Sequence, residues 1–168
     1  MDLTILIISY RSLEKLTKCL TTIGKKRNVL IVENSDDTSL KNNIEKDYKN
    51  SRVILNNSNL GYAKAANIGF KNIHTKYALL LNTDIIIHES QIEDLEIEIE
   101  KLGNDFTLAS PMTNDLVDFI KNNRFDNYFN DHIPSFDPKK NTTKVELIKG
   151  CSLVVNLSKF NSKDVFDN

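Results

Sequence analysis

The sequence has 168 residues, the length of one ordinary domain, and 40% of them are apolar, which is enough for a single core. Its 22 Lys and Arg nearly balance its 23 Asp and Glu, which argues against a nucleic-acid partner because such binding surfaces carry a clear basic excess. The two cysteines and three histidines are too few and too scattered for a structural zinc site.

No apolar run approaches the roughly 20 residues that a membrane-spanning helix needs, and the first residues lack the pattern of a secretory signal. We therefore expect a soluble, cytoplasmic protein whose contact with a membrane, if any, is peripheral. In the cytoplasm Cys19 and Cys151 are expected as reduced thiols, with a disulfide as the alternative.

Apolar and β-branched runs alternate with helical patterns over the first 102 residues. The predicted strands are 3–8, 28–32, 52–55 and 77–81, with a short extended piece at 85–88. The predicted helices are 13–23, 40–48, 62–73 and 90–102. We expect an N-cap at Ser12, a stop at Gly24, and a capping box formed by Ser90 and Glu93. Four strand–helix repeats predict an α/β sandwich with a mostly parallel central sheet.

The remainder of the chain has a different character. A strand is predicted at 107–112, and residues 113–143 form an irregular segment rich in Asn and Asp. Two further strands are predicted at 145–148 and 152–155.

Polar residues follow each of the first four predicted strands. They are Ser9-Tyr10-Arg11, Glu33-Asn34-Ser35, residues 56–61 and Asn82-Thr83-Asp84. Each alone is most often a turn or a helix cap. Ligands of α/β sheets bind at the carboxyl ends of the strands, so four polar ends on one edge favour a binding site.

Known phosphate-binding loops are absent, since the chain has only five glycines and neither G-x-G-x-x-G nor a Walker A motif. A bound diphosphate would therefore need a cation. Asp84, at the end of the most apolar strand, is the best anchor for Mg²⁺ or Mn²⁺, which take carboxylates together with phosphate oxygens.

Two runs carry a family resemblance: Asn59-Leu60-Gly61-Tyr62-Ala63-Lys64-Ala65-Ala66-Asn67-Ile68-Gly69 and Leu79-Leu80-Leu81-Asn82-Thr83-Asp84. The ordered pattern N-x-G-[FY]-[AG]-x-[AG]-x-N-x-G followed by L-L-N-x-D resembles the family 2 glycosyltransferases, in particular their bacterial rhamnosyltransferase-like branch. Matches at residues 7–12, 31–35, 149–154 and 166–168 extend the resemblance over essentially the whole chain. It implies the GT-A fold, a Rossmann-like three-layer sandwich.

The resemblance also implies roles for individual residues. Ser9, Tyr10 and Glu33 would hold the nucleobase and ribose. Asn59, Gly61 and Asn67 would line the nucleotide and diphosphate. Lys64 is either a diphosphate contact or a solvated helix residue, and Tyr62 either a core aromatic or a donor contact.

At the reaction centre, Asn82 and Asp84 would form a variant of the family's D-x-D motif, with Asp84 on the metal. Gly150 and Cys151 would lie near the acceptor. Glu33, Arg11 and Thr83 stand where the family more often has Asp, Asn and Pro, which leaves the base preference open.

The resemblance thus implies an inverting glycosyltransferase that moves a sugar from a UDP- or dTDP-sugar to a glycan or lipid-linked acceptor in surface polysaccharide or glycoconjugate synthesis. Residues 1–112 would form the nucleotide-sugar-binding half and 113–168 the start of an acceptor-side half. The family's catalytic base is expected beyond Asn168, so a non-catalytic nucleotide-sugar-binding fragment or subunit is the alternative. An unrelated α/β interaction module is a third.

Overall fold

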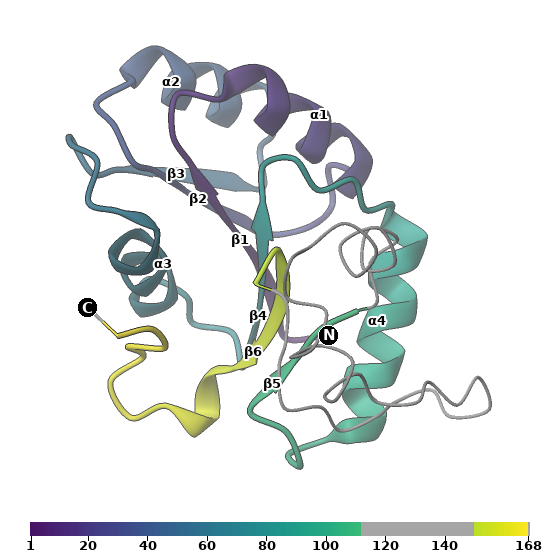
Figure 1. Cartoon of the computed structure of the whole chain (residues 1–168). Coiled ribbons are helices and arrows are strands. Elements are labelled where there is room, and N and C mark those ends of the chain that lie inside the picture. The colour runs from purple at the N-terminus through teal and green to yellow at the C-terminus, as the bar shows by residue number, and fades with distance from the viewer. Residues whose placement is uncertain (112–149, 168) are drawn as a thin grey trace, which may run out of the picture.

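A computed structural model describes residues 1–111 and 150–167, which form a six-stranded sheet flanked by helices (Figure 1). Its strand order is β3-β2-β1-β4-β6-β5. The strands are β1 (Leu3–Ser9), β2 (Val29–Glu33), β3 (Ser51–Leu55), β4 (Tyr77–Asn82), β5 (Leu108–Ala109) and β6 (Ser152–Asn156). The first four are parallel to one another, while β6 is antiparallel to both β4 and β5. The predicted α/β class with a mostly parallel sheet is therefore confirmed.

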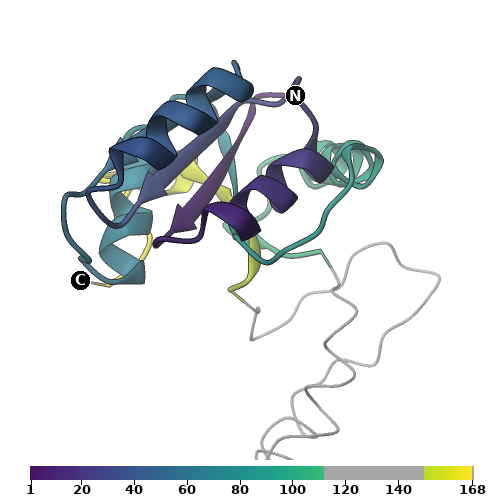
Figure 2. The ribbon, with the colours of Figure 1, turned by 90° about the horizontal axis from the view of Figure 1, so that it is seen from above.

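Helices cover both faces of the sheet. They are α1 (Leu13–Ile23), α2 (Thr38–Asp47), α3 (Tyr62–Lys71) and α4 (Glu89–Leu102), with a short 3-10 turn at Leu157–Lys159. Buried residues of α1, α2 and α4 share one hydrophobic core, and those of α3 share the other with the turn. The chain's C-terminal end lies beside α3 in Figures 1 and 2.

The central strands have apolar side chains on both faces because both faces are covered. In β1, Ile5 and Ile7 belong to the core beneath α1, whereas Leu6 and Ile8 belong to the core beneath α3. This double burial explains why β1 and β4 are continuous apolar runs without polar alternation.

Small residues bring α3 unusually close to the sheet. Ala65, Ala66 and Gly69 are all buried. A methyl group added at Gly69 would approach Cδ2 of Leu6 to 2.7 Å, closer than real Cβ contacts occur. The small-residue side of the predicted helix at 62–73 is therefore its sheet-facing side.

Two predicted helix starts differ from the structure. At α1, Ser12 is the N-cap residue, but its hydroxyl makes no capping bond and instead lies 3.1 Å from the hydroxyl of Ser9. At α4 the predicted capping box is wrong. The helix begins at Glu89, and the backbone N–H of His88 donates to Oε1 of Gln91 at 2.9 Å. Ser90 lies inside the helix, so the cap is formed by His88 and Gln91 and not by Ser90 and Glu93.

Two predicted extended pieces also differ. Residues 85–88 form no strand, and among the described residues of the strand predicted at 107–112 only Leu108–Ala109 are in a strand. The strand predicted at 145–148 lies outside the described residues. The stop predicted at Gly24 is confirmed, and this glycine adopts a φ of 86° that other residues disfavour.

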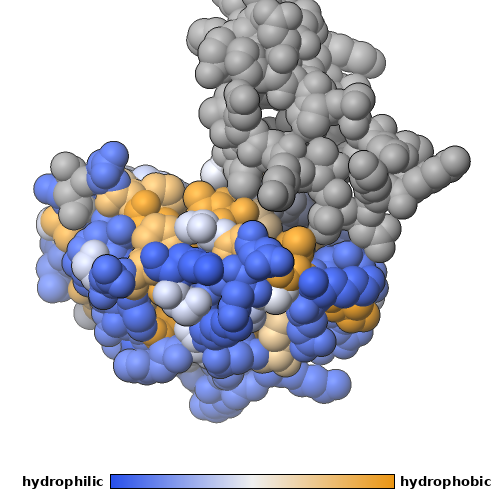
Figure 3. Space-filling model, turned by 90° about the horizontal axis from the view of Figure 1, so that it is seen from below, coloured by the Kyte–Doolittle hydropathy of each residue, from blue (hydrophilic) through white to orange (hydrophobic). Residues whose placement is uncertain are grey.

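The surface seen in Figure 3 is largely hydrophilic, with hydrophobic residues gathered in patches. Within residues 1–111 and 150–167, no helix is long and apolar enough to cross a membrane.

Candidate functional site

The strand order reverses between β1 and β4. The chain steps from β1 to β2 and β3 in one direction, then returns to place β4 on the other side of β1. Loops that leave such a switch point diverge above and below the sheet and leave a crevice at its carboxyl edge, where ligands of open α/β sheets bind.

A cleft of about 650 Å³ lies at this switch point. Its lining includes Tyr10 and Arg11, which follow β1, and Asn82 and Asp84 at the end of β4. Tyr62, the first residue of α3, also lines the cleft, and we call Tyr62, Asn82 and Asp84 the wall. The structure therefore brings together Tyr10, Asn82 and Asp84 of the predicted site residues.

Glu33, the last residue of β2, lies buried beside this cleft. Its Oε1 accepts hydrogen bonds from the backbone N–H of Arg11 at 2.9 Å and from the Ser35 hydroxyl at 2.6 Å. Arg11 adopts a positive φ of 48°, a strained conformation for a non-glycine residue, and this bond helps to hold it there. Among the described residues, nothing bonds to Oε2 of Glu33, so the carboxylate has one buried, unpaired acceptor oxygen behind the cleft lining.

The Arg11 side chain is exposed on the rim of the cleft. Its guanidinium lies 5.7 Å from the centre of the Tyr10 ring and 3.9 Å from the carboxylate of Asp36. Tyr10 is itself 51% exposed, so its ring is accessible for stacking.

Amide side chains close a second part of the same sheet edge. The buried Asn34 donates to Oδ1 of Asn59 at 2.8 Å and accepts from Asn56 Nδ2 and from the Leu60 N–H, both at 3.0 Å. Oδ1 of Asn59 also accepts from the N–H of Gly61 at 3.0 Å. Asn59 and Gly61 thus shape the loop that leads into α3 and are not in the cleft lining.

Asn67, on the inner side of α3, holds the C-terminal segment. Its Oδ1 accepts from the N–H groups of Val165 and Phe166 at 3.0 and 3.1 Å, and its Nδ2 donates to the carbonyl of Phe166 at 2.8 Å. Lys71 forms an ion pair with Asp164 one turn further along. We call residues 163–167 the strap. Asn67 therefore faces the strap and not the cleft.

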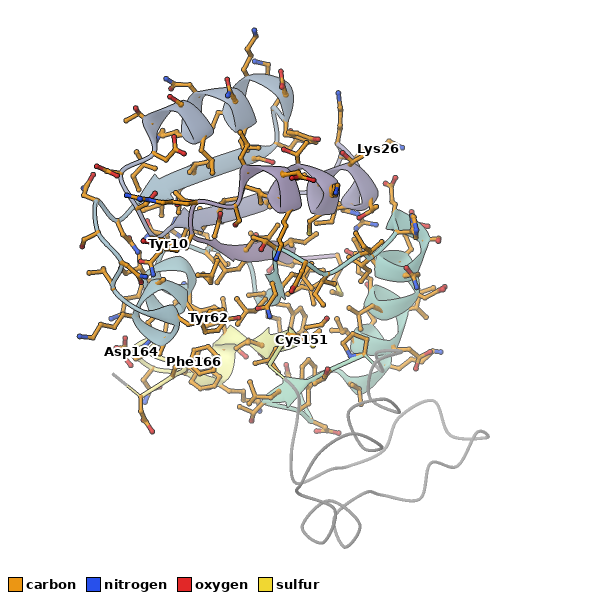
Figure 4. All side chains as sticks on the ribbon, turned by 45° about the horizontal axis from the view of Figure 1, so that its top comes forward. Tyr10, Lys26, Tyr62, Cys151, Asp164 and Phe166 are labelled. Atoms are coloured by element: carbon orange, nitrogen blue, oxygen red, sulfur yellow. The ribbon has the colours of Figure 1, made fainter. Side chains whose placement is uncertain are left out.

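The strap supports Tyr62. The rings of Tyr62 and Phe166 are 6.3 Å apart, and the Tyr62 hydroxyl donates to Oδ1 of Asn82 at 3.1 Å. Figure 4 shows Tyr62, Phe166 and Cys151 close together. Burial, followed by the proximity of Cys151, raises the pKa of Tyr62 to about 12, so its hydroxyl stays protonated at neutral pH. Tyr62 is 42% exposed, so it is a wall residue and not a core aromatic.

Neither predicted acceptor-side residue lines the cleft. Cys151 lies next to it, since its carbonyl accepts from the backbone N–H of Asn82 at 3.1 Å, while Gly150 is exposed. Lys64 is also exposed and outside the lining. Ser9 is buried, and its carbonyl accepts from the N–H of Asn34 at 2.7 Å.

Asp84 is exposed, and no described residue bonds to its carboxylate. Its charge reaches the interior: burial, and secondarily Asp84, raise the pKa of Cys19 to about 11. The part of the chain that the structure describes contains no cluster of three or more His, Cys, Asp and Glu side chains. A single free carboxylate nonetheless fits Mg²⁺ or Mn²⁺ when the ion takes its other ligands from phosphate and water.

The sequence left two roles open for Tyr62, a core aromatic or a donor contact, but it did not predict that Tyr62 bonds to Asn82. That pairing spans 20 positions, and no signal in the sequence indicates it. The predicted halves, 1–112 and 113–168, stay a prediction because most of the second half lies outside the described residues.

The sequence and structure were compared with known proteins. Residues 4–159, more than half of the chain, match the family model described as glycosyl transferase family 2. The teichoic acid poly(glycerol phosphate) polymerase of Staphylococcus epidermidis is 35% identical over 118 residues, which cover 66% of this chain and 16% of that protein.

Solved structures share the fold at low identity. Residues 1–349 of S. aureus TarS superimpose with a TM-score of 0.70 at 15% identity, over 99% of this chain and 50% of that one. A mannosyltransferase from Pyrobaculum calidifontis, in complex with GDP-Man and Mn²⁺, gives a TM-score of 0.65 at 11% identity, over 95% of this chain and 46% of that one. The chain spans half or less of these proteins, and it belongs to glycosyl transferase family 2, with the GT-A fold.

Proposed function

We propose that this domain binds a UDP- or dTDP-sugar in the cleft between β1 and β4 and takes part in transferring the sugar. The observation that carries the proposal is the meeting of Tyr10, Asn82 and the unpaired Asp84 carboxylate at the switch point. TarS of similar fold forms a complex with UDP-GlcNAc, which supports a uridine donor.

The residues near β1 and β2 suit a pyrimidine base. Uracil and thymine both carry an N3–H donor, which would satisfy the buried and unpaired Oε2 of Glu33 once Arg11, whose backbone bonds to the same carboxylate, moves aside. The exposed Tyr10 ring offers a surface for stacking. A base that stacks on Tyr10 while donating to Glu33 would place the ribose and diphosphate toward Asn82 and Asp84.

Asp84 would hold the divalent cation, since its carboxylate is free and lies in the cleft. The ion, when bound, neutralises charge that develops on the leaving diphosphate. The cleft lining also holds two cations, Arg11 and Lys15, and one further carboxylate, Glu14. The wall formed by Tyr62 and Asn82 would fix where the diphosphate sits.

We infer an inverting transfer, in which an acceptor hydroxyl attacks the anomeric carbon from the side opposite the diphosphate and passes its proton to a carboxylate base. The acceptor would be a glycan or a lipid-linked glycan of a surface polymer, supported by the teichoic acid polymerase relative. The anomeric configuration of a product, measured by NMR, tests inversion.

Nucleotide binding tests the donor site directly. Thermal unfolding is measured with UDP, dTDP and GDP, each with and without Mn²⁺, for the unchanged chain and for Asp84→Asn. At a hundred times its dissociation constant, a ligand specific for the folded state stabilises by about 2.7 kcal/mol. We expect a Mn²⁺-dependent shift with UDP or dTDP that Asp84→Asn abolishes.

Asp105→Asn is the matched control. Asp105 is exposed and precedes Phe106, which stacks on Tyr77 at the opposite end of β4 from Asp84. This variant should keep the full shift. A preference for GDP would overturn the pyrimidine assignment, and no shift with any nucleotide would overturn the donor site.

A further inference from the structure

The backbone of Asn82 is fixed at the mouth of the cleft. Its N–H donates to the carbonyl of Cys151 at 3.1 Å, and its own carbonyl accepts from the N–H of Ile85 at 3.2 Å. The side chain therefore leaves β4 from a defined point, and the remaining freedom is the rotation of its amide. That rotation decides whether oxygen or nitrogen faces the ligand.

A hydrogen bond from Tyr62 selects one orientation. The phenol hydroxyl donates to Oδ1 of Asn82 at 3.1 Å. A phenol is protonated at neutral pH and is a good donor to an amide oxygen. With Oδ1 engaged, Nδ2 has no acceptor among the described residues.

The Tyr62 ring packs against Phe166 of the strap. Phe166 lies 6.3 Å from it and 6.2 Å from the Phe70 ring. Asn67 bonds both the N–H and the carbonyl of Phe166. The strap therefore fixes the position from which the hydroxyl reaches Asn82.

An amide that presents N–H and a carboxylate that presents oxygen bind different partners. N–H groups donate to phosphate oxygens, whereas divalent cations require oxygen ligands. Asn82 and Asp84 lie two residues apart on the same wall.

We propose that Tyr62 is a positioning residue that orients Asn82 so that Nδ2 donates to the donor's diphosphate, leaving the cation to Asp84. This inference rests on the proposed nucleotide-sugar site. In this chain the two polar positions of Asn82-Thr83-Asp84 have separate tasks, one for phosphate and one for metal.

Variants of the wall residues test the inference. Tyr62→Phe keeps the ring against Phe166 and removes only the hydroxyl. Losing one oriented hydrogen bond should weaken UDP about three- to tenfold. Uridine, which lacks the diphosphate, should bind within about twofold of wild type because the base contacts are unchanged. Both affinities are measured by calorimetry in Mn²⁺.

A double-mutant cycle shows whether Tyr62 acts through Asn82. Asn82→Ala should weaken UDP about tenfold, and adding Tyr62→Phe should cost nothing more. The Mn²⁺ concentration for half-saturation of the UDP complex should match wild type in each variant. Tyr48→Phe is the matched control, since it also loses one hydroxyl, 3.1 Å from that of Thr21, outside the cleft.

Three outcomes would contradict the inference, and each can be told apart from the others. If Asn82→Ala raises the half-saturating Mn²⁺ concentration about tenfold or more, the amide oxygen is a metal ligand and the inference is overturned. Wild-type UDP affinity in Tyr62→Phe also overturns it. If the unchanged chain binds no UDP, the proposed function fails and the inference fails with it.

Discussion

Two groups of polar side chains occupy the same edge of the sheet, and they differ in how their hydrogen bonds are used. Asn34, Asn56 and Asn59 bond to one another and to backbone groups. By contrast, Nδ2 of Asn82 and both carboxylate oxygens of Asp84 have no hydrogen-bond partner among the described residues. Polar residues after a strand thus either bond within the loops or keep groups that a ligand could bind, and their hydrogen bonds within the protein distinguish the two.

Of the two groups, the loop-building group of Asn34, Asn56 and Asn59 should contribute more to the free energy of unfolding. Asn34→Ala removes the centre of four side-chain hydrogen bonds, with Asn59, Gly61, Asn56 and Leu60. We expect the free energy of unfolding to fall by about 3 kcal/mol, because several donors and acceptors lose their partner at once. Urea denaturation measures it. Asn42→Ala, on the exposed side of α2, is the control, and a similar small loss in both variants would refute the comparison.

Glu33 bridges the two groups, since one oxygen is engaged and the other is free. Glu33→Gln keeps an acceptor for Arg11 and Ser35 but replaces the free oxygen by an N–H₂ donor. UDP affinity should fall about tenfold, because N3–H of uracil would then face a donor. Calorimetry measures the affinity. A variant that unfolds more easily yet binds UDP normally would place Glu33 with the loop-building group.

Alkaline pH should destabilise the fold through the buried Cys19 of α1. The pKa of Cys19 is raised from 9.0 to about 11, so the folded state favours the neutral thiol. Stability from this group is complete below pH 9 and is lost as the pH rises toward 11, by about 1 kcal/mol at pH 10. Thermal unfolding across this range measures the loss. Cys19→Ala should show a flatter curve, and an equally steep one would contradict the prediction.

The smallest effect is expected at Lys64. It is exposed on α3 and absent from the cleft lining, so Lys64→Gln should change UDP affinity by less than about twofold through screened charge alone. A larger loss would show that Lys64 reaches the diphosphate and that the ligand extends toward the loop-building group.

The sequence predicted the first four strands and their helices because each has a distinct apolar period. It did not predict that β6 runs antiparallel beside β4, because pairing direction depends on the path of the chain through space. It placed the α4 capping box at Ser90 and Glu93, since both positions have favourable residue types. The structure instead pairs His88 with Gln91.

For the candidate site, the sequence likewise predicted some positions but not their partners. Tyr10, Asn82 and Asp84 lie at or just after the ends of β1 and β4, so their meeting at one edge follows from strand order. Asn59 and Asn67 come from the same motif, but their partners, Asn34 and Phe166, are distant in sequence. A linear motif gives the residue types without saying which of them bond to the protein itself.

The hydroxyl of Ser110 donates to the carbonyl of Ser152 at 2.7 Å, and Ala109 pairs with Val154 in the sheet. Two positions 42 residues apart in the sequence are thus held together at the edge of the sheet. Loss of the Ser110 hydroxyl would therefore loosen β5 and β6 together, since one hydrogen bond and one strand pairing join them.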